Sequence, residues 1–203
     1  AGVSEEVTEY PEAKVTTIEV LNESGAQQMG RPPGSYITIE VPQTEEAGLL
    51  IDEISEILAK HLKPLLPDVP AQQPFLVAGL GNQHATPDAL GPQTIDFMQP
   101  TRHFFIHVPD AIDAGLHSLA AVSPGVMGTT GIESAAIIRG VAEDVKPCCI
   151  IVIDALSAAS ISRIGTTIQL SDTGIRPGSG LDNARQALNA ETMGVPVIAI
   201  GVP

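Results

Sequence analysis

The sequence predicts an α/β fold, in which helices cover both faces of a mixed, mostly parallel central sheet. Two observations predict it: short apolar runs typical of buried parallel strands recur along the chain, and longer segments of helical spacing alternate with them. The chain has 203 residues, enough to bury one substantial core. We therefore expect a single three-layer αβα domain over residues 1–203, with a hairpin-like segment 1–42 packed on a core of residues 43–203.

In the first third of the chain, the residue pattern predicts strands over residues 14–21 and 36–41. The segment 22–34 between them is rich in glycine and polar residues and carries two adjacent prolines, which predicts a long connection or the edge of a small subdomain. Thr44 is the expected N-cap of a helix. Apolar residues at helical spacing continue this helix to Leu62, and the prolines beyond it predict its end.

The remaining two thirds of the chain contain the strongest strand predictions. Apolar or alternating runs predict strands at residues 75–80, 104–108, 150–154, 166–170 and 197–202. Helical spacing predicts helices at residues 130–145 and 182–193. After the first of these strands, Thr86 is expected to cap a helix with Pro87 at its first position, so that Asp88 lies in the first turn.

Two aspartates, Asp88 and Asp154, are the strongest candidates for chemistry because each follows a predicted parallel strand. Ligands of open α/β sheets bind where the strands end, and two carboxylates brought to that edge can share the acid and base roles of hydrolysis. Each aspartate also has a purely structural interpretation. Asp88 would stabilise the positive end of its helix, and Asp154 would cap a strand end, although burying an unpaired carboxylate there is costly.

Composition excludes several classes of function. A net charge of −14 argues against nucleic-acid binding, because contact with phosphates requires a basic face. The longest apolar runs are too short to span a bilayer, and the acidic start does not resemble a signal peptide. The adjacent cysteines Cys148 and Cys149 lie inside an apolar strand, which predicts core residues in a reducing cytoplasm rather than a disulfide or a nucleophile.

The spacing of the candidate ligands predicts neither a cofactor nor a metal site. The turn at residues 79–82 lacks the third glycine of a dinucleotide-binding fingerprint. The five histidines show no spacing of the His-Glu-x-x-His kind, and no serine lies in a Gly-x-Ser-x-Gly elbow.

Eight short motifs follow one another in a fixed order and together carry a family resemblance. They are Gly79-Leu80-Gly81-Asn82, Thr86-Pro87-Asp88-Ala89-Leu90-Gly91-Pro92, Thr101-Arg102-His103, Pro124-Gly125-Val126-Met127-Gly128, Thr130-Gly131-Ile132-Glu133, Ile153-Asp154-Ala155-Leu156, Asp172-Thr173-Gly174-Ile175 and Pro177-Gly178-Ser179-Gly180. The set resembles the germination protease family, the spore endopeptidases of endospore-forming bacteria. The likeness runs almost end to end and is densest from residue 76 to residue 203.

The resemblance implies an endopeptidase that initiates the degradation of small acid-soluble spore proteins when spores germinate. It implies an atypical aspartic mechanism in which Asp88 and Asp154 are the two catalytic carboxylates, with no cofactor. It further implies a zymogen whose N-terminal pro-segment is removed, a homotetramer, and a location in the cytoplasm of the spore core. Because the family is longer, we expect this chain to lack a helical C-terminal portion.

Four further residues are candidates for substrate binding: Asp172, Arg176, Ser179 and Arg185. Asp172 begins an Asp-Thr-Gly tripeptide like that of pepsin-type aspartic proteases. Since the chain has one copy and an α/β pattern, we interpret the match mainly as coincidental, with a supporting role near the cleft as the alternative. Ser179 lies in a glycine-dense loop. The family's substrates carry a glutamate before the cleaved bond, and Arg176 or Arg185 is expected to meet its charge.

Two alternative functions remain open. The α/β arrangement also resembles the hydrogenase maturation endopeptidases, which bind nickel through two carboxylates and a histidine. Asp88 and Asp154 match the two carboxylates, but no histidine of this chain lies in a matching motif. The second alternative is an inactive fragment or zymogen-derived domain that binds a substrate without cleaving it.

Overall fold

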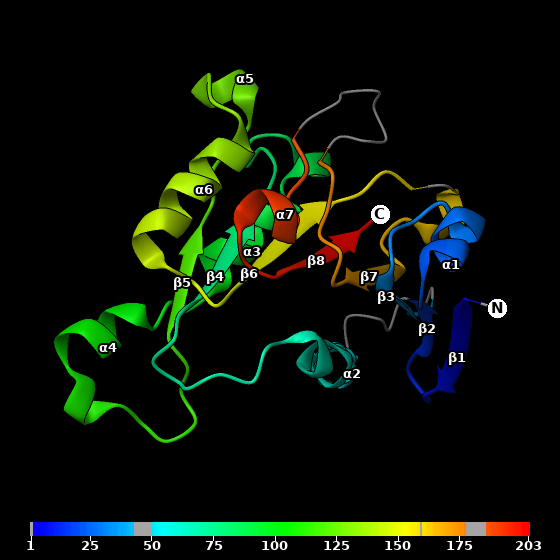
Figure 1. The fold of residues 1–203 in the computed structure, drawn as a ribbon, viewed down its shortest axis with the longest axis horizontal. Helices are drawn as coiled ribbons and strands as arrows, with labels where there is room; N and C mark the ends of the chain where they lie inside the picture. The colour runs from blue at the N-terminus through cyan, green and yellow to red at the C-terminus, as the bar shows by residue number, and fades with distance from the viewer. Residues whose placement is uncertain (1, 43–49, 159, 178–185) are drawn as a thin grey trace. The chain divides into compact units, whose positions relative to one another are not determined.

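The computed structural model describes residues 2–42, 50–158, 160–177 and 186–203 (Figure 1). The chain divides into two compact units, which are described separately. The first unit comprises residues 1–66, 156–173 and 199–203, and the second comprises residues 67–155 and 174–198. The prediction of a single domain over residues 1–203 stays a prediction. No helix in the described part of the chain is long and apolar enough to cross a membrane.

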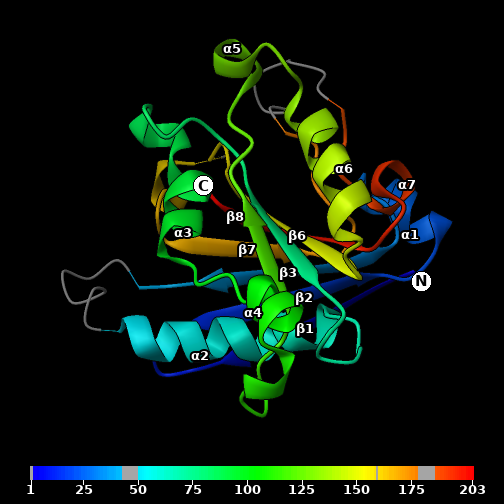
Figure 2. The ribbon, with the colours of Figure 1, turned by 90° about the vertical axis from the view of Figure 1, so that its left-hand side faces the viewer.

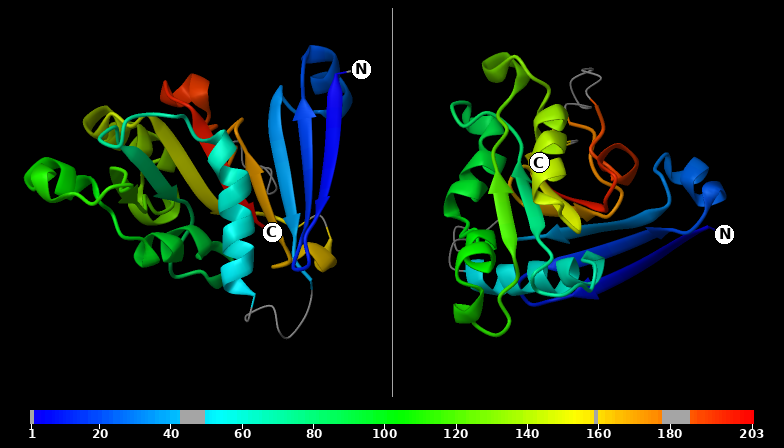
Figure 3. Two further views of the ribbon diagram at one scale, coloured as in Figure 1. Left: turned by 90° about the horizontal axis from the view of Figure 1, so that it is seen from below. Right: turned by 60° about the vertical axis from the view of Figure 1, so that its left-hand side comes forward.

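The first unit is built on an antiparallel sheet. Each strand pairs with the next in the spatial order β1 (Val3–Glu9), β2 (Lys14–Val20), β3 (Gly34–Glu40), β7 (Thr167–Ser171) and the end of β8 (Val197–Val202). The left panel of Figure 3 shows β1, β2 and β3 side by side. The strand predictions for residues 14–21, 36–41, 166–170 and 197–202 are confirmed within one or two residues.

The core of the first unit lies between this sheet and α2 (Ile51–Leu62). Ile57 of α2 is buried together with Val15 of β2 and Ile39 of β3. The short 3₁₀ turn η2 (Lys63–Leu65) follows α2, where the prolines predicted the end of the helix. The predicted N-cap Thr44 lies outside the described residues.

The segment 22–34 connects β2 to β3 as predicted, and it contains a short helix that the residue pattern did not predict. α1 (Glu23–Met29) begins after Asn22, whose side-chain oxygen accepts a hydrogen bond from Gly25 N at 3.0 Å. It ends at Gly30, whose φ of 65° is the left-handed conformation that terminates helices. Seven residues are too few to show an apolar period, so only the capping residues indicate this helix.

The second unit is built on parallel strands. β4 (Phe75–Gly79) lies between β5 (Leu119–Val122) and β6 (Cys149–Ala155) and is parallel to both. Figure 2 shows α3 (Leu90–Phe97) on one side of these strands and α6 (Ser134–Val145) on the other. This arrangement confirms the α/β class, and the strand predictions for residues 75–80 and 150–154 hold.

The core of the second unit fills the space between the parallel strands and α6. Ile138 of α6, Leu76 of β4 and Ile150 of β6 have no exposed surface. Met193, from the short helix α7 (Ala190–Met193), packs into the same cluster. Such closely packed side chains contribute most of the stability of the unit.

Residues 104–108 are not a strand. Residues 104–107 belong to α4 (Arg102–His107), and Val108 separates this helix from the 3₁₀ turn η4 (Pro109–Ala111). A short apolar run fits a strand and a helix equally well, and here Phe104 and Ile106 stay exposed. The segment from 102 to 118 therefore forms an excursion between α3 and β5.

Buried Thr101 closes this excursion at its base. Its hydroxyl donates to the carbonyl of His117 at 2.5 Å and accepts from the amide of Leu119 at 2.9 Å. Its own amide donates to the Leu119 carbonyl at 2.9 Å. One residue thus fixes both ends of the excursion, and β5 starts where this closure sets it.

Two predicted helices are shorter than expected. The predicted helix 130–145 starts only at Ser134, as α6, because the preceding short helix α5 (Met127–Thr130) ends at Gly131, which takes a φ of 73°. Of the predicted helix 182–193, residues 182–185 lie outside the described part. Leu188 forms a β-bridge with Ile175, so the helical turn α7 starts only at Ala190. The 3₁₀ turn η5 (Ile161–Arg163) belongs to the first unit.

Candidate active site

The carboxyl ends of β4 and β6 lie side by side at one edge of the second unit. The strands are parallel, with Gly79 in register with Ile153. The amide of Leu80 donates to the carbonyl of Ile153 at 2.8 Å. Asp154 is the next residue of β6, so its backbone lies level with Leu80, where β4 gives way to its loop.

Asp154 is buried, with 7% of its surface exposed. A carboxylate at such a position has lost most of its water, so the protein around it must stabilise either its charge or its proton. Asp154 does interact with a partner in the structure. A buried carboxyl at a strand end fits acid and base chemistry better than it fits a solvated surface cap.

Asp88 is brought back to the end of β4 by a tight loop. It closes the 3₁₀ turn η3 (Thr86–Asp88), and its amide donates to the Ala85 carbonyl at 2.8 Å. The amide of Asn82 donates to both the carbonyl oxygen and the Oδ2 of Asp88, each at 2.9 Å. The backbone of Asn82 therefore holds the half-buried Asp88 carboxylate two residues after Leu80.

This loop differs in detail from the prediction. Pro87 does lie in the first positions of a helical turn, but the Thr86 side chain makes no capping hydrogen bond and α3 begins only at Leu90. The hydrogen bonds from the Asn82 amide to Asp88 cannot be predicted from the sequence, because every residue other than proline has a backbone amide. Only the side chain of Asn82, which accepts from the His84 amide at 3.0 Å, indicates a turn.

Gly81 permits the close approach of Asp88. Its φ is +117°, which side chains rarely adopt, and a Cβ built on it would lie 1.9 Å from the Asp88 carbonyl oxygen. Gly79 is equally crowded, because its Cβ would lie 2.2 Å from the carbonyl oxygen of Gly91 at the start of α3. Glycines at these positions let β4, the loop and α3 pack without a gap.

Asp88 and Asp154 therefore lie on neighbouring structures at one edge of one unit. The turn that carries Asp88 contacts β6, which carries Asp154. The two carboxyls differ in surroundings, since Asp154 is buried and Asp88 accepts a backbone hydrogen bond at a half-exposed site. Such a pair can divide the proton-accepting and proton-donating roles of hydrolysis.

Asp172 lies in the first unit and is exposed. Its Oδ1 accepts a hydrogen bond from the amide of Ser35 at 2.8 Å, at the start of β3. The neighbouring Thr173 hydroxyl bonds to Ser171 and donates to the Tyr36 hydroxyl. These contacts give the Asp-Thr-Gly segment a structural task, while its part in substrate binding stays a prediction.

The other three predicted substrate-binding residues are Arg176, Ser179 and Arg185. Arg176 is exposed, in the second unit, two residues after Gly174. Ser179 and Arg185 lie outside the described residues.

The cysteines behave as core residues. Cys149 has no exposed surface, and burial, followed by the neighbouring Cys148, raises the pKa of its thiol to about 12. Burial also raises the pKa of Cys148. Neither thiol is therefore an activated nucleophile. Within the described residues, no group of three or more His, Cys, Asp and Glu side chains is arranged to hold a metal ion.

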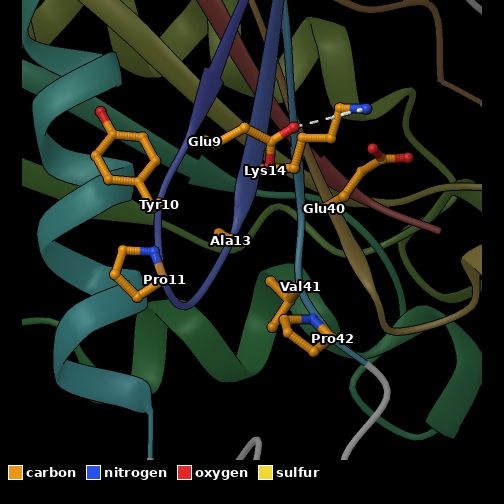
Figure 4. Close-up of a pocket in the computed structure, with 8 residues that line it drawn as sticks. All are labelled: Glu9, Tyr10, Pro11, Ala13, Lys14, Glu40, Val41 and Pro42. Carbon is orange, nitrogen blue, oxygen red and sulfur yellow. Dashed lines mark ion pairs between the residues drawn. The ribbon is translucent and has the colours of Figure 1, made fainter.

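A surface pocket of about 310 Å³ lies in the first unit (Figure 4). It is formed around the β1–β2 hairpin, where Lys14 Nζ lies 4.0 Å from an oxygen of Glu9. Tyr10, Pro11 and Pro42 contribute apolar surface to its lining. None of the predicted site residues lines it, so the candidate active site does not depend on this pocket.

The chain is similar to known proteins over its whole length. A family model described as germination protease matches residues 1–203. Curated proteins named germination protease from Clostridium perfringens (strain 13), Clostridium tetani and Geobacillus sp. (strain WCH70) are 44%, 47% and 48% identical over 202, 201 and 193 residues. These alignments cover 99%, 98% and 94% of this chain, which spans 62%, 62% and 52% of those relatives' own lengths.

Among solved structures, the [NiFe] hydrogenase maturation protease HycI from Thermococcus kodakarensis is similar at 16% sequence identity. The match covers 64% of this chain and 73% of that protein, with a TM-score of 0.39. A likeness of this size carries no conclusion about function.

Proposed function

The chain belongs to the germination protease family, and from this premise we propose that it is the catalytic part of an endopeptidase that acts during spore germination. In this proposal Asp88 and Asp154 carry the reaction. The single observation that supports the assignment best is their convergence at the carboxyl edge of β4 and β6, in the second unit.

The proposed chemistry is direct attack of a water molecule on the scissile carbonyl. One carboxylate of the pair accepts a proton from the water as it attacks, and the other carboxyl polarises the carbonyl or protonates the leaving amine. Two carboxyls held near one another favour a state in which they share one proton, which supplies both roles at once. The Asn82 amide keeps the Asp88 carboxylate aimed during this exchange.

The proposed substrates are the small acid-soluble spore proteins, cleaved after a glutamate. Among the described residues, exposed Arg176 is the cation that we propose meets that glutamate, and Asp172, Ser179 and Arg185 complete the proposed set of substrate-binding residues. The proposed assembly is a homotetramer formed from a zymogen in the cytoplasm of the spore core. These statements follow from the family resemblance.

The test is cleavage of a purified small acid-soluble spore protein by the mature form of the full-length protein, from which the proposed pro-segment has been removed. Asp88→Asn and Asp154→Asn should each lower kcat by about 10²–10⁴-fold, the usual contribution of an acid or base. Asp172→Asn is the matched control for kcat, since it makes the same change at another strand end and leaves both proposed catalytic carboxylates in place, and its kcat should equal that of the parent.

Near-parental cleavage by both Asp88→Asn and Asp154→Asn would refute the proposal. Circular dichroism of each variant separates a lost function from a lost fold. A metal-dependent mechanism predicts a different outcome: activity would disappear with a chelator and return with added metal, and stoichiometric metal would be found in the purified protein.

A further inference from the structure

β5 forms one edge of the parallel strands of the second unit. It pairs with β4, with Val77 in register with Ala121 and Ala78 with Val122, and it is the last strand in the spatial order. Figure 2 shows this edge facing the viewer between α3 and α6. An edge strand leaves one row of backbone amides and carbonyls free to pair with another chain.

The register decides which backbone groups of β5 form that row. The amide of Phe75 in β4 donates to the carbonyl of Ser118 at 2.9 Å. Since successive residues of a strand turn their backbone groups to opposite sides, Ser118, Ala120 and Val122 face β4. Leu119 and Ala121 therefore direct their amides and carbonyls outward.

The outward amide and carbonyl of Leu119 already have hydrogen-bond partners within the protein. Thr101 pairs with both of its outward groups, through the hydroxyl to the amide and through its own amide to the carbonyl. Ala121 has no such partner: among the described residues, no hydrogen bond is made by its amide or its carbonyl. A donor and an acceptor, correctly spaced for a strand, thus remain open two residues further on.

We propose that the Ala121 edge of β5 binds the protein substrate as an added β-strand, which leads the scissile bond toward the carboxyl edge that carries Asp88 and Asp154. This inference rests on the proposed function. Its occupant is an extended segment of the substrate, because main-chain pairing with a sheet edge requires that conformation and no particular side chain.

The distance from this edge to the candidate active site suits such a substrate. Ala121 is in register with Val77, and Leu80, at the level of Asp154, is three residues further along the strand direction. Three residues of strand span about 10 Å. A substrate that pairs at Ala121 and runs parallel to β5 therefore reaches the level of the carboxyl edge about three residues beyond its anchoring point. From there it must turn across the ends of β5 and β4, which lie between it and β6 at about 4.8 Å per strand.

Ala121→Pro tests the edge directly. It removes the outward amide and spares the bonds to β4, because proline is tolerated in an edge strand where its nitrogen faces away from the sheet. Cleavage of a small acid-soluble spore protein should show a KM raised by about three- to tenfold, the value of one hydrogen bond, with kcat unchanged. Ala121→Val keeps the amide and should raise KM less.

Glu5→Pro is the matched control. It lies on β1, the other terminal strand in the spatial order, in the first unit. Leu21 N donates to Gly2 O and Tyr10 N to Ala13 O, so the alternation turns the Glu5 amide outward. The same substitution there should leave KM and kcat at parental values.

Hydrogen exchange provides a second readout that needs no change at the edge. In the Asp154→Asn protein, saturating small acid-soluble spore protein should slow exchange of the Ala121 amide at least tenfold. An unprotected Ala121 amide, or a KM within twofold of the parent in a folded Ala121→Pro protein, would overturn the proposal. If Ala121→Pro does not fold, the exchange result alone decides.

These experiments distinguish a failure of the added-strand proposal from a failure of the proposed function on which it rests. Lost cleavage in Asp154→Asn together with an unchanged KM in Ala121→Pro refutes only the added strand. Parental cleavage in both Asp88→Asn and Asp154→Asn refutes the function itself, and with it the inference.

Discussion

Each unit of this molecule carries an aspartate at the end of a strand, and the two aspartates have different surroundings. Asp154 is the second-to-last residue of β6 in the second unit and is buried beside the loop that follows β4. Asp172 follows β7 in the first unit, is exposed, and accepts a hydrogen bond from the Ser35 amide. Sequence alone presents both as an acidic residue after an apolar or alternating strand.

The direction of the neighbouring strand explains the difference. β6 runs parallel to β4, so the carboxyl ends of both strands, with their loops, meet at one edge and bring Asp154 toward Asp88. β7 runs antiparallel to β3, so its carboxyl end meets the amino end of β3, where a backbone amide is available. An aspartate at a strand end therefore gathers other side chains in a parallel sheet and caps a backbone in an antiparallel one.

The largest expected effect concerns the pair in the parallel unit. The double variant Asp88→Asn/Asp154→Asn should be no slower than the slower single variant, whose kcat is about 10²–10⁴-fold below the parent, because residues that act as a unit are not additive. Steady-state kinetics on a small acid-soluble spore protein measures this. Losses that multiply in the double variant would mean that the two carboxyls act separately.

The second-largest effect is expected from displacing the loop that holds Asp88 in the parallel unit. Gly81→Ala places a Cβ against the Asp88 carbonyl, so the loop must move, and a shift near 1 Å lowers kcat by about 10²-fold. Gly115→Ala is the control, since Gly115 also has a positive φ, of +93°, with no atom within 4 Å of its Cβ. It should reduce stability by about 1–2 kcal/mol, the cost of strained backbone, and leave kcat unaltered.

A smaller effect is expected in the antiparallel unit. Asp172→Ala leaves the Ser35 amide without its acceptor and should lower the free energy of unfolding by about 0.5–1.5 kcal/mol. Urea denaturation measures the change, and kcat should equal that of the parent. A fall in kcat of tenfold or more without loss of stability would place Asp172 in catalysis and remove the contrast between the units.

The smallest effect is a pH dependence, also in the first unit. Burial, helped by nearby Lys60 and opposed by Glu6, lowers the pKa of His61 from its usual 6.5, and the ring bonds to the Tyr10 hydroxyl at 3.0 Å. The unfolded chain then binds a proton that the folded chain does not, so stability falls as the pH drops below about 6.5.

His61→Gln removes this titration and keeps a hydrogen-bonding group for Tyr10. The difference in unfolding free energy between parent and variant should be constant above pH 7.5 and should shift in favour of the variant below pH 6.5. Urea denaturation across this range measures it. A difference that stays constant down to pH 5 would contradict the burial of His61.

Much of the fold can be predicted because parallel strands buried on both faces are continuously apolar. β4 and β6 have that pattern, and their bounds were predicted within one or two residues. α1 and α4 could not be predicted in the same way. A helix of six or seven residues shows too little of its period, and Phe104 and Ile106 of α4 face solvent instead of a core.

The candidate site divides along similar lines. The positions of Asp88 and Asp154 after their strands predict that both reach the carboxyl edge, and the family resemblance supplies the role proposed for them. The contacts that hold Asp88 were beyond prediction from the residues, because the donor is a backbone amide. Gly81 is the residue that hints at these contacts in the sequence, since a glycine at a strand end indicates a close approach of another backbone.

Thr101 has a consequence for how this protein tolerates change during evolution. Because one side chain and one amide fix the residues on both sides of the excursion at 102–118, the register of β5 does not depend on what the excursion contains. Loops closed at their base accept insertions and deletions at a small entropic cost. Among orthologues, length variation should therefore accumulate between Arg102 and His117, while the closing threonine persists.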